Sequence, residues 1–270
     1  MRSKPCTVLV QGCYFKPFLL EYIYMNKGNL YIVATPIGNL GDITLRALET
    51  LKSVDFILCE DTRVTKNLLN HYQIMKPMIS YHQHSDLKKV KEINELLEQG
   101  KNLALVTDAG TPGISDPGNL LIQSIIHSRT PHTVIPAQAG IQSGETPDSR
   151  FRGNDMIIPV PGPSAVISAL SISGFPTDKF LFLGFPPHKN KRQKFFKEAV
   201  ASEYTVAFYE SGHRILKCLQ ELKELLDPKR QILVCRELTK KFETIYRGTI
   251  AEVSEKMKDD RGEFVVVINR

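Results

Sequence analysis

Strand-like apolar segments alternate with helical segments through the first two thirds of this chain, and Gly/Pro-rich turns follow three of the strands. Residues 29–34 form the first apolar run, and a helix capped by Asp42 or Thr44 is expected from about residue 44. Because β-turn-α repetition builds a parallel sheet with helices on its faces, the order predicts an α/β fold. Further strands are expected at 56–59, 78–81, 103–107 and 156–160, and further helices through Leu68 and Leu69, between Ser85 and Gly100, and over 120–127.

The last third of the chain predicts a second α/β unit of a different kind. Its strands are expected at 180–184, 205–209, 231–235, 244–249 and 264–268, with helices at 214–226 and 250–258. Several of these strands follow one another without a long crossover, which favours a mixed sheet. The segment 173–179 reads as a hinge, so we predict an N-terminal domain over 25–175 and a C-terminal domain over 176–270.

Two segments do not fit either unit. Residues 129–155 are rich in Gly, Pro, Ser and Asp, resemble the translated product of a mobile palindromic repeat, and predict a foreign surface loop. Residues 1–24 are basic and then apolar, but Gln11 and Lys16 interrupt the apolar part, which argues against a signal peptide. We expect a tail outside the fold, and Met25 is an alternative start of translation.

Composition narrows the class of protein. No apolar run is long enough to span a bilayer, and the five cysteines form no CxxC pair, so we expect a cytoplasmic protein without a membrane anchor or a metal site. The formal net charge is +6, and residues 176–270 hold nineteen basic against fourteen acidic residues. A basic face suits a polyanion such as nucleic acid, although an ordinary solvated surface explains this excess equally well.

The three turns are predicted to bind a ligand, because parallel sheets bind ligands at the carboxyl ends of their strands. The first, residues 35–42, matches neither the dinucleotide fingerprint nor a P-loop. In the second, residues 107–118, Asp108 or Asp116 is placed to accept hydrogen bonds from ribose hydroxyls or an amino group. In the third, residues 159–165, Ser164 is a natural helix cap and the small Ala165 leaves room for a planar ring.

Together the turns and the motifs between them resemble the ribosomal RNA small-subunit methyltransferase I family of the tetrapyrrole-methylase superfamily. The resemblance covers about 25–128 and 156–270. It implies a two-domain fold with S-adenosylmethionine in a cleft between the domains, and methylation of a cytidine ribose 2′-hydroxyl in the decoding centre of 16S rRNA. The matching motifs are TPIGNLGDIT (35–44), EDTR (60–63), YHQH (81–84), DAGTPGISDPG (108–118), PGPSA (161–165), FYESGHR (208–214), RELTK (236–240) and RGE (261–263).

The resemblance also implies site residues. Contacts to the cofactor are expected from Pro36, Asp108, Ala109, Gly110, Thr111, Ile114, Ser164, Ala165, Tyr209, Glu210 and Leu238.

A ribose hydroxyl is a poor nucleophile, so a base or an orienting group is expected beside it. The candidates are the bases Glu60, Asp61 and Glu237 and the cations Arg63, Lys240 and Lys241. Each candidate has an alternative role. Glu60 and Arg63 could form a salt bridge with each other, and Glu237 could only cap the end of a strand. His82 and His84 lack the third partner that a metal site needs.

The segment 188–197 is expected to contact RNA. Lys189, Lys191 and Arg192 are placed to bind phosphates, whereas Phe195 and Phe196 have the spacing of core residues on a helix.

Two other functions remain open on the sequence. A tetrapyrrole methylase is the first, although such relatives usually carry a G-x-G-P-G first turn and a GDP motif, where this chain has TPIGN and AGTPG. An RNA-binding relative inactivated by the loop 129–155 is the second. The family resemblance also implies a homodimer that acts on the small ribosomal subunit.

Overall fold

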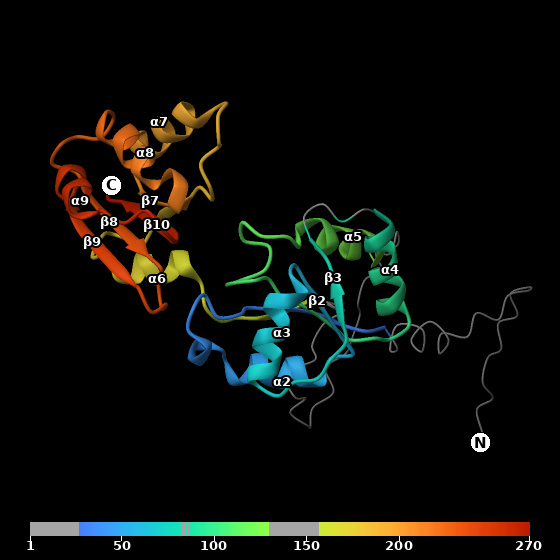
Figure 1. Ribbon diagram of the computed structural model, residues 1–270. Coiled ribbons are helices and arrows are strands. Elements are labelled where there is room, and N and C mark those ends of the chain that lie inside the picture. The colour runs from blue at the N-terminus through green and yellow to red at the C-terminus, as the bar shows by residue number, and fades with distance from the viewer. Residues whose placement is uncertain (1–26, 83–84, 86, 130–156) are drawn as a thin grey trace, which may run out of the picture.

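The computed structural model describes residues 27–82, 85, 87–129 and 157–270, and Figure 1 shows them as two α/β units, each built on a five-stranded sheet. The predicted tail 1–24, His84 and nearly all of the predicted loop 129–155 lie outside the described residues. Within them, no helix has the length and apolar character needed to cross a membrane.

The N-terminal sheet is entirely parallel, as the β-turn-α order predicts. Its strand order is β3-β2-β4-β1-β5. The strands are β1 (Leu30–Val33), β2 (Phe56–Cys59), β3 (Met78–Ser80), β4 (Leu103–Leu105) and β5 (Ile157–Val160).

Helices cover both faces of this sheet. α2 (Leu45–Ser53) and α3 (Thr62–His71) bury residues such as Leu51 and Leu69 on one face. α4 (Leu87–Glu98) and α5 (Asn119–Arg129) bury Ile93 and Leu121 on the other. Because every strand runs the same way, the turns after β1, β4 and β5 reach the same edge of the sheet.

Side-chain caps mark the starts of α2 and α3. The Thr44 side chain accepts a hydrogen bond from the Ala47 N–H, so Thr44 and not Asp42 caps α2, while Asp42 belongs to the short 3-10 helix η1 (Leu40–Asp42). Asp61 caps α3 through the Arg63 N–H. These contacts satisfy amides that the first turn of a helix leaves without a partner.

The C-terminal sheet is mixed, as the short connections predict. Its order is β6-β7-β10-β8-β9, with β6 and β7 parallel and the other neighbours antiparallel. The strands are β6 (Phe180–Phe182), β7 (Thr205–Ser211), β8 (Gln231–Arg236), β9 (Thr244–Thr249) and β10 (Glu263–Ile268).

Four helices pack on the C-terminal sheet. α7 (Arg192–Ala201), α8 (Gly212–Lys223) and α9 (Ile250–Lys256) cover one face, where Phe196 is buried and Phe195 packs against the same core. The prediction that these two phenylalanines belong to the core is therefore confirmed. α6 (Ala165–Ser171) covers the other face through Ala169 and Leu170, although it precedes the predicted boundary at residue 175.

Candidate active site

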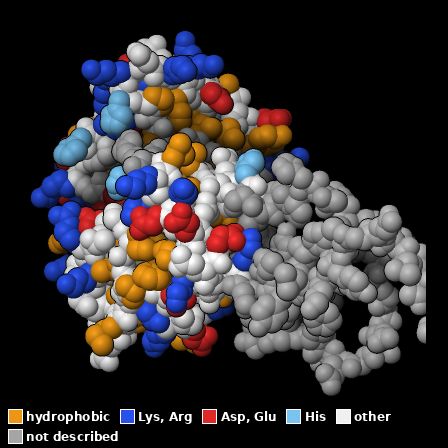
Figure 2. Space-filling model, turned by 90° about the vertical axis from the view of Figure 1, so that its right-hand side faces the viewer, with side chains coloured by type: hydrophobic (Ala, Val, Ile, Leu, Met, Phe, Trp, Pro, Cys, Tyr) orange, Lys and Arg blue, Asp and Glu red, His pale blue; other side chains and the backbone are white. Residues whose placement is uncertain are grey.

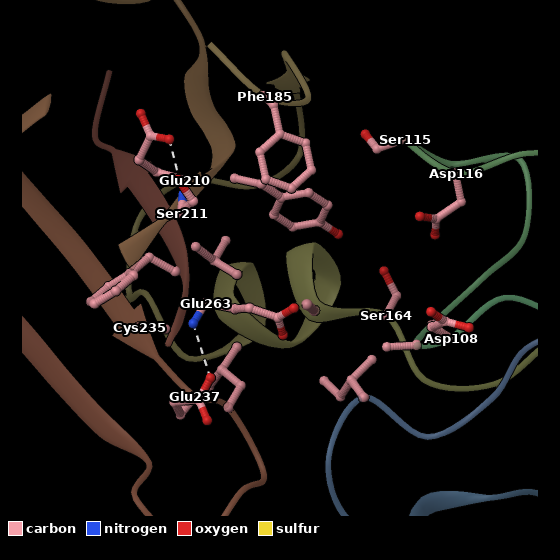
Figure 3. A pocket seen from close by; sticks show the side chains of 18 of the residues that line it. Asp108, Ser115, Asp116, Ser164, Phe185, Glu210, Ser211, Cys235, Glu237 and Glu263 are labelled. Carbon is pink, nitrogen blue, oxygen red and sulfur yellow. Dashed lines mark hydrogen bonds between the residues drawn. The ribbon is translucent and has the colours of Figure 1, made fainter. Parts of the chain in front are cut away.

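A cleft of about 450 Å³ opens where the two units meet, and Figure 3 shows it from close by. One wall consists of the turns after β1, β4 and β5, and the other of β7, β10 and the loop between β8 and β9. The residues that line it are Ile37, Glu60, Asp108–Thr111, Ile114–Asp116, Ser164, Ala165, Phe185, Tyr209–Ser211, Cys235, Glu237, Leu238, Lys240 and Gly262–Val265.

Hydrogen bonds join the three Gly/Pro-rich turns to one another. The Thr35 N–H donates to the Gly110 carbonyl at 2.9 Å, and the Gly110 N–H donates back to the Thr35 carbonyl at 3.1 Å. The Thr111 hydroxyl donates to the Pro163 carbonyl at 3.2 Å. β5 pairs with β1 over four residues, so the third turn stands beside the other two although it follows the segment 130–156.

The first turn also touches the C-terminal unit. The Asn39 N–H donates to the Thr239 hydroxyl at 3.0 Å. A β-carbon at Gly38 would lie 2.3 Å from Cγ of Lys240, so only glycine permits this approach without displacing the lysine side chain. The predicted turn 35–42 and the motif RELTK are therefore neighbours across the cleft.

Lys240 lies between two carboxylates at the cleft wall. Its Nζ donates to Oε1 of Glu237 at 2.9 Å and to Oε2 of Glu263 at 2.8 Å, and the Glu263 N–H donates to the same Glu237 oxygen at 2.9 Å. Burial opposes both charges, but these contacts outweigh it: the pKa of Glu237 is lowered and that of Lys240 is raised. Glu237 and Thr239 have φ angles of 51° and 66°, a strained conformation of the kind found at functional sites.

In a second group of carboxylates the pKa values are raised, whereas that of Glu237 is lowered. Burial, then the nearby Asp108, raises the pKa of Glu60, and burial also raises the pKa of Asp108 itself. Burial, together with Glu60, Asp108 and Glu263, raises the pKa of Asp116 to about 7. This side of the cleft carries more negative charge than its surroundings neutralise.

The structure brings most of the predicted site residues together. Ten of the eleven expected cofactor contacts line the cleft, and Pro36 is the neighbour of the lining residue Ile37. Glu60, Glu237 and Lys240 line it as well. Arg63 does not: its side chain is 87% exposed and pairs with Asp61 at 2.6 Å, so the alternative Glu60–Arg63 salt bridge is wrong.

Arg192 corrects the prediction of an RNA contact. Its side chain is 5% exposed and binds Oε2 of Glu210 at 3.0 Å and Oε2 of Glu221 at 2.8 Å. Lys189 and Lys191 remain exposed. The guanidinium is thus already neutralised by two carboxylates and cannot reach a phosphate.

Glu210 contributes to the cleft in a different way from the one expected. Its carboxylate is fully buried and also pairs with Arg214 at 2.7 Å, while its Oε1 accepts from the Ser211 N–H. The residue lines the cleft, but its charge is used inside the C-terminal unit.

Phe185 and Glu263 are among the cleft residues that sequence reasoning did not single out. The Phe185 ring is 51% exposed and lies 5.3 Å from the Tyr209 ring, centroid to centroid. Gly184 before it has a φ of 65°, and a phenylalanine directly after the predicted strand 180–184 was the available signal. Glu263 was seen only as part of the RGE motif.

No metal centre emerges from the described part of the chain, where no three His, Cys, Asp or Glu side chains are grouped to bind an ion. Cys235 lines the cleft, but burial raises the pKa of its thiol to about 12, so it is not a thiolate nucleophile near neutral pH.

Comparisons with known proteins agree with this architecture. A family model described as Tetrapyrrole (Corrin/Porphyrin) Methylases matches residues 29–143 and 153–254. The uroporphyrin-III-C-methyltransferase structure from Thermus thermophilus has a TM-score of 0.59 at 14% identity, over 90% of this chain and 94% of that one. That identity supports the fold alone.

Curated relatives are much closer in sequence. The Ribosomal RNA small subunit methyltransferase I of Synechocystis is 43% identical over 244 residues, 89% of this chain and 78% of that protein. The protein of the same name from Thermotoga maritima is 39% identical over 90% of this chain and 98% of its own length. The chain therefore belongs to the tetrapyrrole methylase family and, within it, to the ribosomal RNA small subunit methyltransferase I family.

Proposed function

We propose that this protein transfers a methyl group from S-adenosylmethionine to the ribose 2′-hydroxyl of a cytidine in the decoding centre of 16S rRNA. The observation that carries the proposal is the meeting of the three turns with the RELTK loop in one cleft, since these motifs define the resemblance to the rRNA methyltransferases. The acceptor is the small ribosomal subunit, and we propose a cytoplasmic homodimer by the same resemblance.

The residues of the cleft fit this cofactor. The volume of about 450 Å³ lies in the range of small-molecule pockets. Ile37, Ala165 and Leu238 offer apolar surface to a purine ring, and the turn at Gly110 and Thr111 brings main-chain groups to the cavity. The raised pKa values of Glu60 and Asp108 indicate a site short of positive charge, which the sulfonium and ammonium groups of the cofactor would supply.

The protein's own contribution is to align and to deprotonate. When bound, the cofactor supplies a methyl group on positively charged sulfur, which is a good leaving group. The cleft walls would hold the acceptor oxygen in line with that carbon, and such positioning supplies much of the rate in reactions of this kind. Lys240, held between Glu237 and Glu263, is placed to orient a ribose or phosphate oxygen at the wall of the cleft.

The direct test is transfer of labelled methyl from S-adenosylmethionine to small ribosomal subunits from a strain that lacks the enzyme. We expect one methyl group per subunit, which mass mapping places on the ribose of a cytidine. A protein with residues 129–155 deleted serves as the comparison for the predicted inserted loop. No transfer by either protein, with stoichiometric spectral binding of a tetrapyrrole, would favour the tetrapyrrole alternative. No binding of S-adenosylmethionine in calorimetry would favour an inactive relative.

The segment before α7 provides a prediction about RNA affinity. Figure 2 shows Lys and Arg side chains gathered at the top of the molecule, the height at which Figure 1 places α7. Replacing Lys189 and Lys191 by alanine should weaken binding to the subunit and lower the slope of log K against log salt by about 1.5, because each lost phosphate contact removes about 0.7–0.9. The exposed pair Lys52 and Lys66 on the N-terminal helices is the matched control. An unchanged slope would remove this segment from the RNA interface.

A further inference from the structure

Building on the proposed function, we propose that the carboxylate of Asp116 is the general base that accepts the proton of the acceptor 2′-hydroxyl. Figure 3 shows Asp116 and Glu263 pointing into the cleft from opposite sides, one from each unit. Ser115, directly before Asp116, has a φ of 64°, which is a strained conformation for a residue other than glycine. Its hydroxyl oxygen lies 3.2 Å from a β-carbon built at Gly184, so the strained turn is held against the C-terminal unit.

Three other carboxylates in or near the cleft are already engaged by cations or main-chain N–H groups. Glu237 accepts hydrogen bonds from Lys240 and from the Glu263 N–H, and Glu263 pairs with Lys240. Asp61 caps α3 and binds Arg63, and the Arg63 contacts lower its pKa to about 2. A base whose charge is already neutralised in this way gains little by taking a proton.

Two further carboxylates are partly compensated. Asp108 accepts the Asp61 N–H at 3.2 Å and lies near Arg63. Glu60 lies near His82, whose charge favours its ionised form. Burial raises the pKa of Asp116, and the nearby charges of Glu60, Asp108 and Glu263 raise it further, while no described residue donates a hydrogen bond to it. Tyr209 is the other titratable group that faces it, and Lys240 is engaged by Glu237 and Glu263.

The acceptor hydroxyl, the cofactor and Asp116 together account for every bond and proton of the reaction. As the acceptor oxygen forms its bond to the methyl carbon, the carbon–sulfur bond breaks and leaves its electron pair on sulfur. The hydroxyl proton passes to Asp116, which later releases it to water. The products are a ribose methyl ether, a neutral thioether and the protonated carboxyl. A pKa of about 7 suits this task, because a base works best when its pKa is near the working pH.

The pH dependence has a definite sign. Asp116 must be ionised to accept the proton, so kcat/KM of the unsubstituted protein should rise with pH and level off above about pH 7. In Asp116→Asn this limb should disappear. The substitution keeps the size of the side chain and removes one of four crowded negative charges, so it should not lower the melting temperature.

The test measures kcat, the pH profile and calorimetric binding of S-adenosylmethionine for the unsubstituted protein, Asp116→Asn and Asp116→Glu, with the exposed Asp178→Asn as control. We expect Asp116→Asn to lose about 100-fold or more in kcat, the usual contribution of a general base, with cofactor affinity changed less than about threefold. Asp116→Glu should recover part of the rate and a pH limb at a shifted position.

Three results would overturn the assignment: a rate for Asp116→Asn within about fivefold of normal, a pH limb that persists in it, or a loss of cofactor affinity as large as the loss of rate. The last would make Asp116 a counter-charge for the cofactor. Absence of transfer by the unsubstituted protein would instead overturn the proposed function, and this assignment with it.

Discussion

Replacing Arg192 by alanine is expected to lower the free energy of unfolding by about 3–5 kcal/mol, because removing one partner of a buried ion pair leaves the other charge without compensation. Glu210 has no exposed side-chain surface, and Arg214 would remain its only cationic partner among the described contacts. Glu221 would lose its bond as well. Urea unfolding followed by circular dichroism measures the change.

The exposed neighbour Lys191 provides the control for this experiment, and Lys191→Ala should change the stability by less than about 0.5 kcal/mol. In the double variant Arg192→Ala with Glu210→Gln, part of the lost stability should return, since the buried carboxylate is gone. Equal stability of Arg192→Ala and Lys191→Ala would show that the buried pair is unimportant, and would reopen the prediction that Arg192 binds RNA.

Replacing Lys240 by alanine is expected to reduce kcat/KM about 100-fold, which corresponds to about 2.7 kcal/mol of transition-state stabilisation. Lys240 separates Glu237 from Glu263, and without it these carboxylates join Glu60, Asp108 and Asp116 in a cleft with no compensating amine. Methyl transfer to small ribosomal subunits is the measurement. The exposed Lys256→Ala on α9 is the matched control and should retain near-normal activity.

The loss of stability in Lys240→Ala should depend on pH. The pKa of Glu237 is lowered in the fold, so its contacts stabilise the protein fully above the ordinary pKa of 4.5 and lose that effect as the pH falls through the lowered value. The stability difference between Lys240→Ala and the unsubstituted protein should therefore be present at pH 7 and shrink in acid. A difference that stays constant down to pH 2 would mean that Lys240 acts through packing and not through charge.

Local patterns predicted most of the fold. The buried strands and amphipathic stripes follow from spacing, and the cap at Thr44 follows from one side chain and one amide a turn away. The parallel and mixed sheets follow from connection lengths. α8 shows the limit of this reasoning: it begins at Gly212, two residues before the predicted start, because the stripe that begins at Ile215 reports only its buried face.

Ion-pair partners that lie far apart along the chain could not be predicted from the sequence. Arg192 stands in a run of exposed basic residues, and nothing local distinguishes it from Lys189 or Lys191. Its carboxylate partners come from β7 and α8, 18 and 29 residues away. The motif that contains Glu210 led us to expect this residue at the cofactor. The direction of its carboxylate depends on Arg192 and Arg214, which folding brings beside it. The motifs located the cleft, and the packing decided which side chains face into it.

The buried Arg192–Glu210 pair also lies between the two surfaces that we propose for binding. Glu210 and Ser211 form part of the cofactor cleft, while Glu210 holds the first turn of α7 directly after the exposed lysines that we propose for RNA. A ligand that shifted this strand would therefore change the position of the basic segment. Thermodynamic linkage then requires reciprocity: whatever factor the cofactor applies to the affinity for the ribosomal subunit, the subunit applies to the affinity for the cofactor. The order in which the two bind would follow from their concentrations in the cell, with neither one obliged to come first.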